Sequence, residues 1–359
     1  DCLLSRGLGD VYKRQDEDVD VVRSPVAGNT NNRVYFTGDS VDNMKPRVTK
    51  NSVAIGSGTV YPSVSYRLGI PAPATALTST VVGAAPANTD DEVKESRAYV
   101  YTFVTADGEE GPPSPPSAVF DLYPTSQTVN LSSMVTAENA SYNVTHKYIY
   151  RTVTSTAGTS YMFVSTVALS AATYSDSLTS LQLGGVLPST DWVAPPEAMI
   201  GLTSLSNGIL AGFKDNEVMF CEPFMPHAWP TKYRMSTDYP IVGIKAVGSS
   251  LIITTKAYPY VAQGAHPSSM TLARMRENQS CVSKRSMVNM GSHVMYASPD
   301  GLISASGTNT VLATEMVYSR TQWQAMKPET IHGYMYEGNY IGLYTCLLYT
   351  SDAADEEDS

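Results

Sequence analysis

A glycine-marked hairpin occurs four times in the C-terminal half of this chain of 359 residues. The marker glycines, Gly208, Gly248, Gly291 and Gly338, lie 40, 43 and 47 residues apart. Each one leads into an apolar segment with the composition of a β-strand. A β-unit that recurs about every 40 to 50 residues is typical of β-propeller blades. The repeat therefore predicts an all-β fold with propeller blades, and a β-sandwich with evenly spaced hairpins is the alternative.

The two ends of the chain differ from the rest. Residues 5–15 resemble the translation of a transposon-type sequencing adapter, and residues 346–356 resemble that of its partner adapter. Short stretches within these two segments can be encoded by opposite strands of one DNA, which no folding constraint explains. We therefore interpret residues 1–15 and 346–359 as adapter-derived, and we expect residues 16–345 to be an internal fragment of a longer protein.

Composition narrows the function classes once the terminal segments are set aside. They hold three basic and seven acidic residues, so residues 16–345 keep 21 basic and 27 acidic residues and a net charge of −6, against −10 for the whole chain. Mild acidity argues against a surface that coats nucleic acid throughout, although not against a local basic patch. Cys221 and Cys281 are too few for a disulfide framework, so we interpret them as buried thiols. No apolar run is long enough to span a bilayer as a helix.

A blade-like pattern also occurs near the start of the chain. Residues 32–38 echo residues 216–221, which form the second predicted strand of the first marked hairpin. We therefore expect a propeller-blade fragment over residues 16–69 and further blades over residues 191–345, with a different domain between them.

Residues 70–190 have the composition of a β-sandwich. Residues 98–104 alternate with the period of a strand. A glycine-proline turn over residues 107–116 follows, and two more predicted strands cover residues 147–151 and 161–167. The Tyr-x-Tyr strand and the turn after it resemble a fibronectin type III domain, although the order of the pieces departs from the usual one. The sequence thus predicts a partial β-propeller with an inserted fibronectin type III-like sandwich, bounded by proline-rich segments.

One α-helix is predicted, over residues 320–327. Ser319 and Gln322 have the spacing of a capping box, in which each side chain accepts a hydrogen bond from the other residue's backbone. Pro328 ends the helix, because proline cannot continue the hydrogen-bond ladder. We expect this helix to brace two blades.

The motif search finds no established catalytic or ligand-binding pattern. The five histidines have no metal-ligand spacing, and the sequence has neither a nucleophile elbow nor a phosphate loop. The loop over residues 222–230, with Glu222 and His227, has the residue types of a sugar cleft, but such a loop more often packs between blades. Residues 298–301 faintly resemble the Asp-box turn of sialidase propellers, and an Asp-Gly hairpin turn explains them equally well. The sequence therefore predicts a protein that is not an enzyme, with no catalytic residue, no cofactor and no metal. The histidines are His146, His227, His266, His293 and His332.

The sequence contains one basic cluster, formed by Arg274, Arg276, Lys284 and Arg285. Four cations within a dozen residues suit a contact with DNA or with an acidic partner subunit. A solvated strand face explains the same residues without any partner. We retain the cluster as the candidate contact site.

Several stretches resemble the nozzle, or tail tubular, proteins of short-tailed bacteriophages. The resemblance covers most of residues 32–344 and rests on short phrases without a catalytic motif. It implies a β-propeller that carries a sandwich insertion and contributes no catalytic residue. The phrases are residues 66–73, 222–223, 226–230, 278–286 and 296–302.

The resemblance also implies partners and a location. Such subunits form a ring, typically a hexamer, below the portal and adaptor of the virion, where tail fibre or spike proteins attach. DNA passes through the lumen without sequence-specific binding. The expected location is therefore the virion tail, after assembly in the cytoplasm of the bacterial host.

Two other classes of protein stay open. A secreted β-propeller that binds glycans or hydrolyses them as a glycoside hydrolase would need clustered carboxylates in a cleft for the hydrolysis. A bacterial surface adhesin would have sandwich domains in tandem rather than one inserted between blades.

Overall fold

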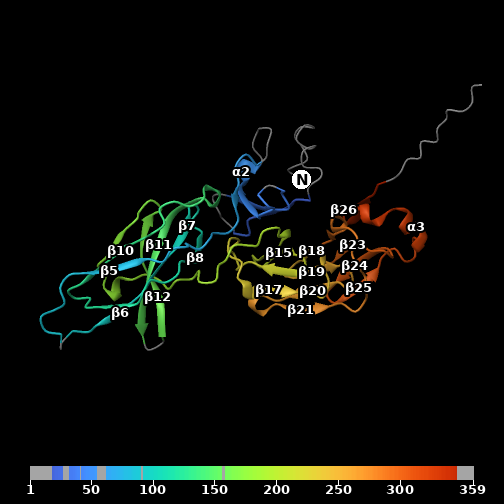
Figure 1. The fold of residues 1–359 in the computed structure, drawn as a ribbon. Helices are drawn as coiled ribbons and strands as arrows, with labels where there is room; N and C mark the ends of the chain where they lie inside the picture. Colours follow the sequence, from blue (N-terminus) through green and yellow to red (C-terminus); the bar gives the residue numbers. More distant parts are fainter. Residues whose placement is uncertain are drawn as a thin grey trace, which may run out of the picture. The chain divides into compact units, whose positions relative to one another are not determined.

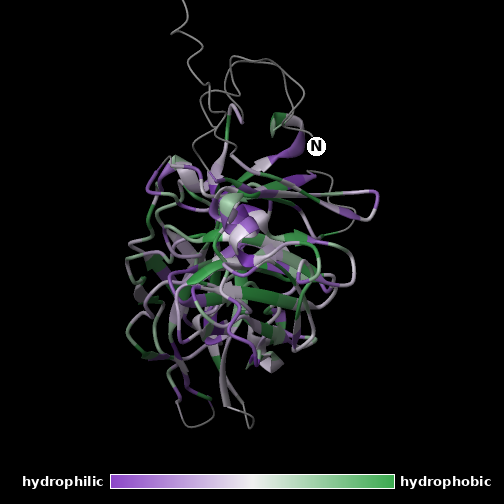
Figure 2. Ribbon diagram, turned by 90° about the vertical axis from the view of Figure 1, so that its right-hand side faces the viewer, coloured by the Kyte–Doolittle hydropathy of each residue, from purple (hydrophilic) through white to green (hydrophobic). Residues whose placement is uncertain are grey.

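The computed structural model describes residues 18–26, 32–40, 42–54, 62–89, 92–155 and 158–345. Within these ranges the chain forms antiparallel β-sheets with two short α-helices (Figure 1). Figure 2 shows strands coloured as hydrophobic, as expected where a sheet is buried on both faces. The predicted all-β fold class is confirmed. The terminal segments interpreted as adapter-derived lie outside the described residues.

The chain divides into two compact units. The first contains the residues up to Leu202 together with Gly208–Ala211 and Met219–Arg234, and the second contains Thr203–Asn207, Gly212–Val218 and the residues from Met235 onward. No helix among the described residues is long and apolar enough to cross a membrane.

The first unit begins with a four-stranded sheet that has the strand order of a propeller blade. Its strands run antiparallel in the order β1-β2-β3-β4, with β2 buried along its whole length. A short helix, α2 (Asn51–Ala54), follows β3 and was not predicted from the sequence. The strands are β1 (Asp20–Arg23), β2 (Arg33–Thr37), β3 (Arg47–Lys50) and β4 (Tyr66–Arg67).

A β-sandwich follows within the same unit. One sheet has the order β13-β10-β5, the other has the order β12-β11-β7-β8, and β6 pairs with β9. The strands are β5 (Thr78–Val82), β6 (Glu95–Arg97), β7 (Tyr99–Thr105), β8 (Glu110–Pro113), β9 (Phe120–Leu122), β10 (Thr128–Ser132), β11 (Val144–Ser155), β12 (Gly158–Ala168) and β13 (Tyr174–Asp176).

The sandwich core lies between its two sheets. Tyr99, Tyr101 and Phe103 of β7 point to one side, where they pack against apolar residues of β10 such as Val129 and Leu131. Alternation sends the other β7 side chains to the opposite face, where a second apolar cluster contains Val100, Tyr150 and Leu187. All seven residues of β7 are therefore buried.

The chain leaves the first sheet and returns from the sandwich along adjacent segments. A Cβ placed on Gly69, just after β4, would come within 2.6 Å of the Cα of Ala194, which lies beyond the sandwich. Gly69 has φ +86, a conformation that glycine adopts without steric cost. Segments so distant in sequence and so close in space are typical of an inserted domain. Independent folding of residues 70–190 stays a prediction, because the first sheet and the sandwich belong to one compact unit.

The remaining strands form three four-stranded sheets and a final hairpin, β26-β27. The four-stranded orders are β14-β15-β16-β17, β18-β19-β20-β21 and β22-β23-β24-β25. The strands are β14 (Ile200–Ser204), β15 (Leu210–Lys214), β16 (Glu217–Phe220), β17 (Arg234–Ser236), β18 (Ile241–Val247), β19 (Ser250–Thr255), β20 (Tyr260–Gln263), β21 (Thr271–Arg274), β22 (Val288–Asn289), β23 (Val294–Ala297), β24 (Leu302–Ser306), β25 (Asn309–Leu312), β26 (His332–Tyr336) and β27 (Asn339–Leu343).

The marker glycines occupy the same place in each repeat. Gly208, Gly248, Gly291 and Gly338 all have positive φ, and each lies in the turn between the first and second strands of its sheet. Such turns need residues that tolerate the left-handed region, which is why glycine recurs there. Each marker glycine therefore corresponds to one β-sheet, as the repeat predicted.

The second α-helix, α3 (Arg320–Ala325), forms with the predicted capping box between Ser319 and Gln322. It ends two residues earlier than expected, because Lys327 adopts positive φ and starts a 3₁₀ turn at Pro328–Thr330. Trp323 is buried, and its indole Nε1 donates a hydrogen bond of 2.8 Å to the backbone oxygen of Ser298. The helix thereby attaches to the turn between β23 and β24.

Candidate functional site

The structure divides the predicted basic cluster into two pairs. Arg274 ends β21, and Arg276 follows it, with both side chains exposed. Lys284 and Arg285 lie in the 3₁₀ helix η5 (Lys284–Ser286), and the Lys284 side chain sits beside Gly243 of β18. Because β18 and β21 are opposite edges of one sheet, the pairs attach to strands roughly 14 Å apart. The four cations therefore do not form one patch on a strand face.

Arg274 already has partners within its own unit. Its Nη1 lies 3.8 Å from the Asp238 carboxylate, and its guanidinium lies 4.8 Å from the ring centroid of Tyr258. These exposed contacts contribute little to stability and leave the cation accessible to an acidic partner. A role of this pair in partner or DNA contact stays a prediction.

The second half of the loop over residues 222–230 is buried, whereas Phe224 and Met225 in its first half are exposed. His227 is 5% exposed and Trp229 is 1% exposed. The Trp229 indole donates a hydrogen bond of 2.8 Å to the oxygen of Pro226, and the ring of Trp192 meets His227 edge-on at 5.6 Å. This arrangement agrees with the packing interpretation of the loop, because side chains so buried do not face a polymer in solution.

His227 belongs to a buried polar cluster within the first unit. Arg33 of β2 forms an ion pair with Glu109, which lies in the turn between β7 and β8. The Nδ1 of His227 lies 3.6 Å from the same carboxylate oxygen. Burial, together with the Arg33 charge, lowers the pKa of His227 to about 3. Burial raises the pKa of Glu109, although the Arg33 charge opposes that shift. The cluster joins three segments of the unit through a neutral imidazole and an ion pair.

A second buried network holds the sandwich together. Arg151 of β11 and Asp176 of β13 are both fully buried, and their Nη1 and Oδ2 atoms lie 2.6 Å apart. The Tyr99 hydroxyl donates a hydrogen bond of 2.7 Å to the same oxygen. Since β7 and β11 belong to one sheet and β13 to the other, this carboxylate links the two sheets.

Lys147 is another buried cation of the sandwich. Its Nζ donates to the backbone oxygens of Val135, Leu169 and Ala171 at 2.7, 2.9 and 2.6 Å. Burial lowers its pKa to about 8. Lys147 and Arg151 are four residues apart on one strand, so strand alternation places both side chains on the same face of the sheet. This much could be predicted from the sequence. The pattern did not reveal that this side is buried.

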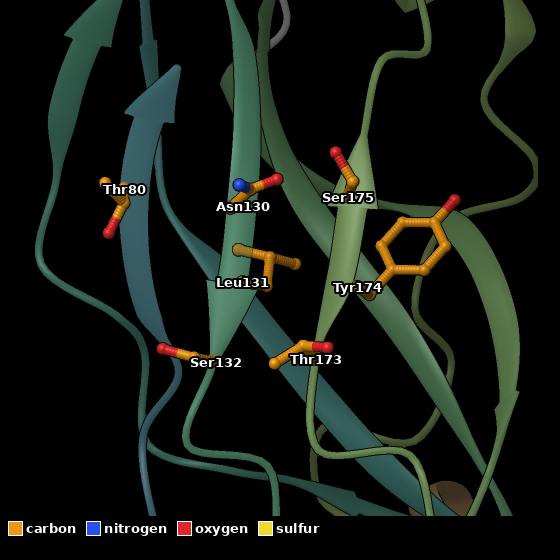
Figure 3. A pocket seen from close by; sticks show the side chains of 7 residues that line it. All are labelled: Thr80, Asn130, Leu131, Ser132, Thr173, Tyr174 and Ser175. Atoms are coloured by element: carbon orange, nitrogen blue, oxygen red, sulfur yellow. The ribbon is translucent and has the colours of Figure 1, made fainter.

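A shallow depression of about 440 Å³ lies on the outer sandwich sheet (Figure 3). Thr80, Asn130 and Ser175 form a row across its three strands, because Asn130 pairs in register with each of the other two. Its lining has no titratable group other than the Tyr174 phenol, so this surface suits hydrogen bonding to a neutral polar ligand rather than acid–base chemistry. The lining residues are Thr80, Asn130, Leu131, Ser132, Thr173, Tyr174 and Ser175.

The two carboxylates considered for hydrolysis lie in different units. Glu222 belongs to the first unit and Asp300 to the second. Asp300 occupies the turn between β23 and β24, where its backbone N–H donates to the Ser298 hydroxyl and its carboxylate pairs with Arg320 at 3.1 Å. The hairpin-turn interpretation of residues 298–301 therefore accounts for this residue.

The remaining titratable candidates do not assemble into a metal site. Among the residues that the structure describes, no group of three or more His, Cys, Asp and Glu side chains is placed to hold a metal ion. Cys221 and Cys281 are buried free thiols, as interpreted from the sequence. Burial raises the pKa of the Cys281 thiol to about 11, which keeps it protonated and unreactive at neutral pH.

Comparisons with known proteins add little to the description of the β-sheets. No protein-family model matches the chain, and no curated protein matches it. Among solved structures, the crystal structure of the N-terminal domain of Nup159 is similar over 54% of this chain and 49% of its own length, at 9% sequence identity and a TM-score of 0.27. The chain thus spans about half the length of that domain. At this TM-score the likeness supports no conclusion about function.

Proposed function

We propose that this chain is a structural subunit of a bacteriophage tail nozzle or tube, where it forms part of the ring through which DNA leaves the virion. One observation carries the proposal. A β-sandwich interrupts a series of four-stranded antiparallel sheets, and the chain leaves and rejoins that series at neighbouring points, Gly69 and Ala194. This is the architecture that the resemblance to phage nozzle proteins implies.

The placement of the charged groups supports a structural role. Two ion pairs, Arg33 with Glu109 and Arg151 with Asp176, are buried where separate segments meet. Breaking such a pair leaves an uncompensated buried charge, which strongly destabilises the fold. A subunit through which DNA is ejected benefits from segments that are joined in this way.

The proposal includes partners and a location. The subunit forms a homo-oligomeric ring, a hexamer by resemblance, and contacts the portal or adaptor on one side and tail fibre or spike proteins on the other. DNA crosses the lumen without sequence-specific binding, and the protein performs no catalysis. The exposed pair Arg274 and Arg276 is the first candidate for an acidic partner or for DNA. The ring assembles in the host cytoplasm and resides in the virion tail.

Glycan binding is the second candidate function. The depression beside Asn130 favours it, since hydroxyl and amide side chains without charge suit a neutral sugar. No carboxylate contributes to that lining. The observation favours binding over hydrolysis.

A glycan-cleavage and glycan-binding screen of the full-length gene product separates these classes. We expect no turnover of any polysaccharide. Cleavage that is lost in Glu222→Gln or Asp300→Asn, and retained in the surface control Glu138→Gln, would overturn the structural role. Saturable binding that is lost in Asn130→Ala, without cleavage, would favour the second candidate.

A further inference from the structure

The final hairpin, β26-β27, presents two different faces. Alternation along the paired strands puts Gly333 and Tyr340 on one of them. The Tyr340 hydroxyl donates a hydrogen bond of 2.9 Å to the oxygen of Ser286. A Cβ on Gly333 would come within 2.7 Å of the Val288 side chain. This face therefore packs on η5 and β22 at Gly333 and Tyr340, whereas Met335 on the same face is 52% exposed.

The other face of the hairpin is open. Tyr334 and Tyr336 of β26 are 50% and 63% exposed, and Ile341 and Leu343 of β27 are 39% and 59% exposed. Tyr334 lies directly opposite Ile341 in the strand register. We call these four side chains the open face. Two polar side chains share this face, because His332 pairs with Leu343 and Asn339 pairs with Tyr336. Exposed apolar side chains that lie together in this way mark a contact surface.

The two preceding sheets pack against each other. Ile252 and Val261 of one sheet share a buried apolar cluster with Tyr296 and Ile303 of the next. The first strands also follow one another in space, since β18 contacts β22 and β22 contacts β26. Within the second unit, the hairpin therefore follows two sheets that pack against each other through a shared apolar cluster.

The hairpin is also half the size of its predecessors. It has two strands, whereas each of the two sheets before it has four. Among the described residues, one face of this hairpin packs on the preceding sheet region and none covers the opposite face.

We infer that the open face is a blade-packing surface, and that its occupant is a further antiparallel β-sheet of the same polypeptide, with an uncharged aliphatic face. An aliphatic face would bury Tyr334, Ile341 and Leu343 without removing a charge from water. Sheets that pack in this way lie about 10 Å apart with interlocking side chains. The inference does not depend on the proposed tail function.

The area of the open face indicates whether its occupant belongs to the same polypeptide or to a separate protein. Four partly exposed large side chains supply roughly 400 Å². A standard stable complex buries about 800 Å² on each partner, so a separate protein would bind this face weakly. A sheet in the same polypeptide has an effective concentration in the millimolar range or above, at which so small a contact forms.

Cysteine labelling tests the inference. Leu343→Cys is introduced into this chain and into the full-length product of the gene. Cys2 and Cys346 are replaced by serine in this chain, and the native Cys221 and Cys281 are buried. We expect a maleimide to react at least about tenfold more slowly with the full-length product, at every protein concentration, because a covered thiol is inaccessible. Thr159→Cys, an exposed position of β12, is the control and should react equally in both proteins.

Three results would overturn the inference. Equal rates in the two proteins would mean that nothing in the gene product covers the face. Slowing that grows with protein concentration would identify a second copy as the occupant. Slow labelling in this chain by itself would show that the chain already covers the face. If Leu343→Cys fails to fold, as judged by circular dichroism, Tyr336→Cys on the other strand gives the same test.

Discussion

Single residues in this protein take their roles from their surroundings rather than from their type. His227 stands among a carboxylate and aromatic residues in the sequence, a combination that suits a sugar cleft. In the structure its imidazole is buried beside Glu109 and Arg33. Burial disfavours the charged form of a histidine, so His227 stays neutral in the fold. The titration of this imidazole therefore affects the stability of the fold, and we assign it no catalytic role.

This placement predicts a specific response to acid. The pKa of His227 is about 3 in the folded state, against an ordinary value of 6.5. Between these two values the unfolded state binds one more proton, so the stabilisation is complete above pH 6.5 and is lost as the pH falls, by about 1.4 kcal/mol per pH unit. Urea unfolding between pH 7.5 and 4.5 should show this loss, and His227→Gln should lack that part of it. Equal pH dependence in the two proteins would contradict the assignment. The raised pKa of Glu109 acts in both proteins and does not produce a difference between them.

The ion pair of the sandwich predicts a second effect of a single residue. Arg151→Met leaves the Asp176 carboxylate buried without its closest cation, and we expect the free energy of unfolding to fall by about 3 to 5 kcal/mol. The control is Lys232→Met, which removes an exposed ion pair with Asp191 and should change the free energy by less than about 1 kcal/mol. Both values come from urea unfolding at neutral pH. Similar losses in the two variants would show that burial does not set the strength of the Arg151 pair.

Secondary-structure elements follow from the sequence wherever their signals are local. The marker glycines predicted the first turn of each repeat, and Ser319 with Gln322 predicted the start of α3. The basic cluster divides into two pairs in the structure, because residues close in sequence lie on different elements of the fold. Arg276 and Lys284 are eight residues apart, yet the chain between them passes from one edge of a sheet to the other. Such a displacement depends on tertiary packing and leaves no local signal.

Two glycines with the same backbone conformation should respond differently to substitution. Gly69 has φ +86 and Gly108 has φ +79, so alanine is strained at both positions. That strain costs roughly 1 to 2 kcal/mol. At Gly69 the added methyl group also meets the Cα and Cβ of Ala194 at 2.6 and 2.5 Å, whereas nothing lies within 4 Å at Gly108.

We therefore expect Gly69→Ala to lower the free energy of unfolding by at least about 3 kcal/mol and Gly108→Ala by about 1 kcal/mol. Thermal and urea unfolding of the two variants measure the difference. If Gly69→Ala is no worse than Gly108→Ala, the segments before and after the sandwich do not lie against each other in the way described.

At the scale of the whole molecule, the chain is a series of antiparallel sheets interrupted by a sandwich, with an open face on its final hairpin. The sequence predicted the C-terminal part of this series because each of its sheets repeats the same glycine turn. Its assembly could not be predicted from the residues alone, since a ring depends on surfaces between copies. The tail-ring role therefore requires a measurement of the assembled protein.

Mass photometry of the full-length gene product tests the central proposal most directly. A ring subunit should give one discrete oligomer of several copies, with a hexamer expected from the resemblance, and its mass should not drift with concentration, because closed rings have a fixed number of subunits. Replacing Arg274 and Arg276 by glutamine should leave the monomer folded. The oligomer mass of this variant then shows whether the pair contributes to the ring contact. A full-length product that stays monomeric at every concentration up to the micromolar range would contradict the proposed role.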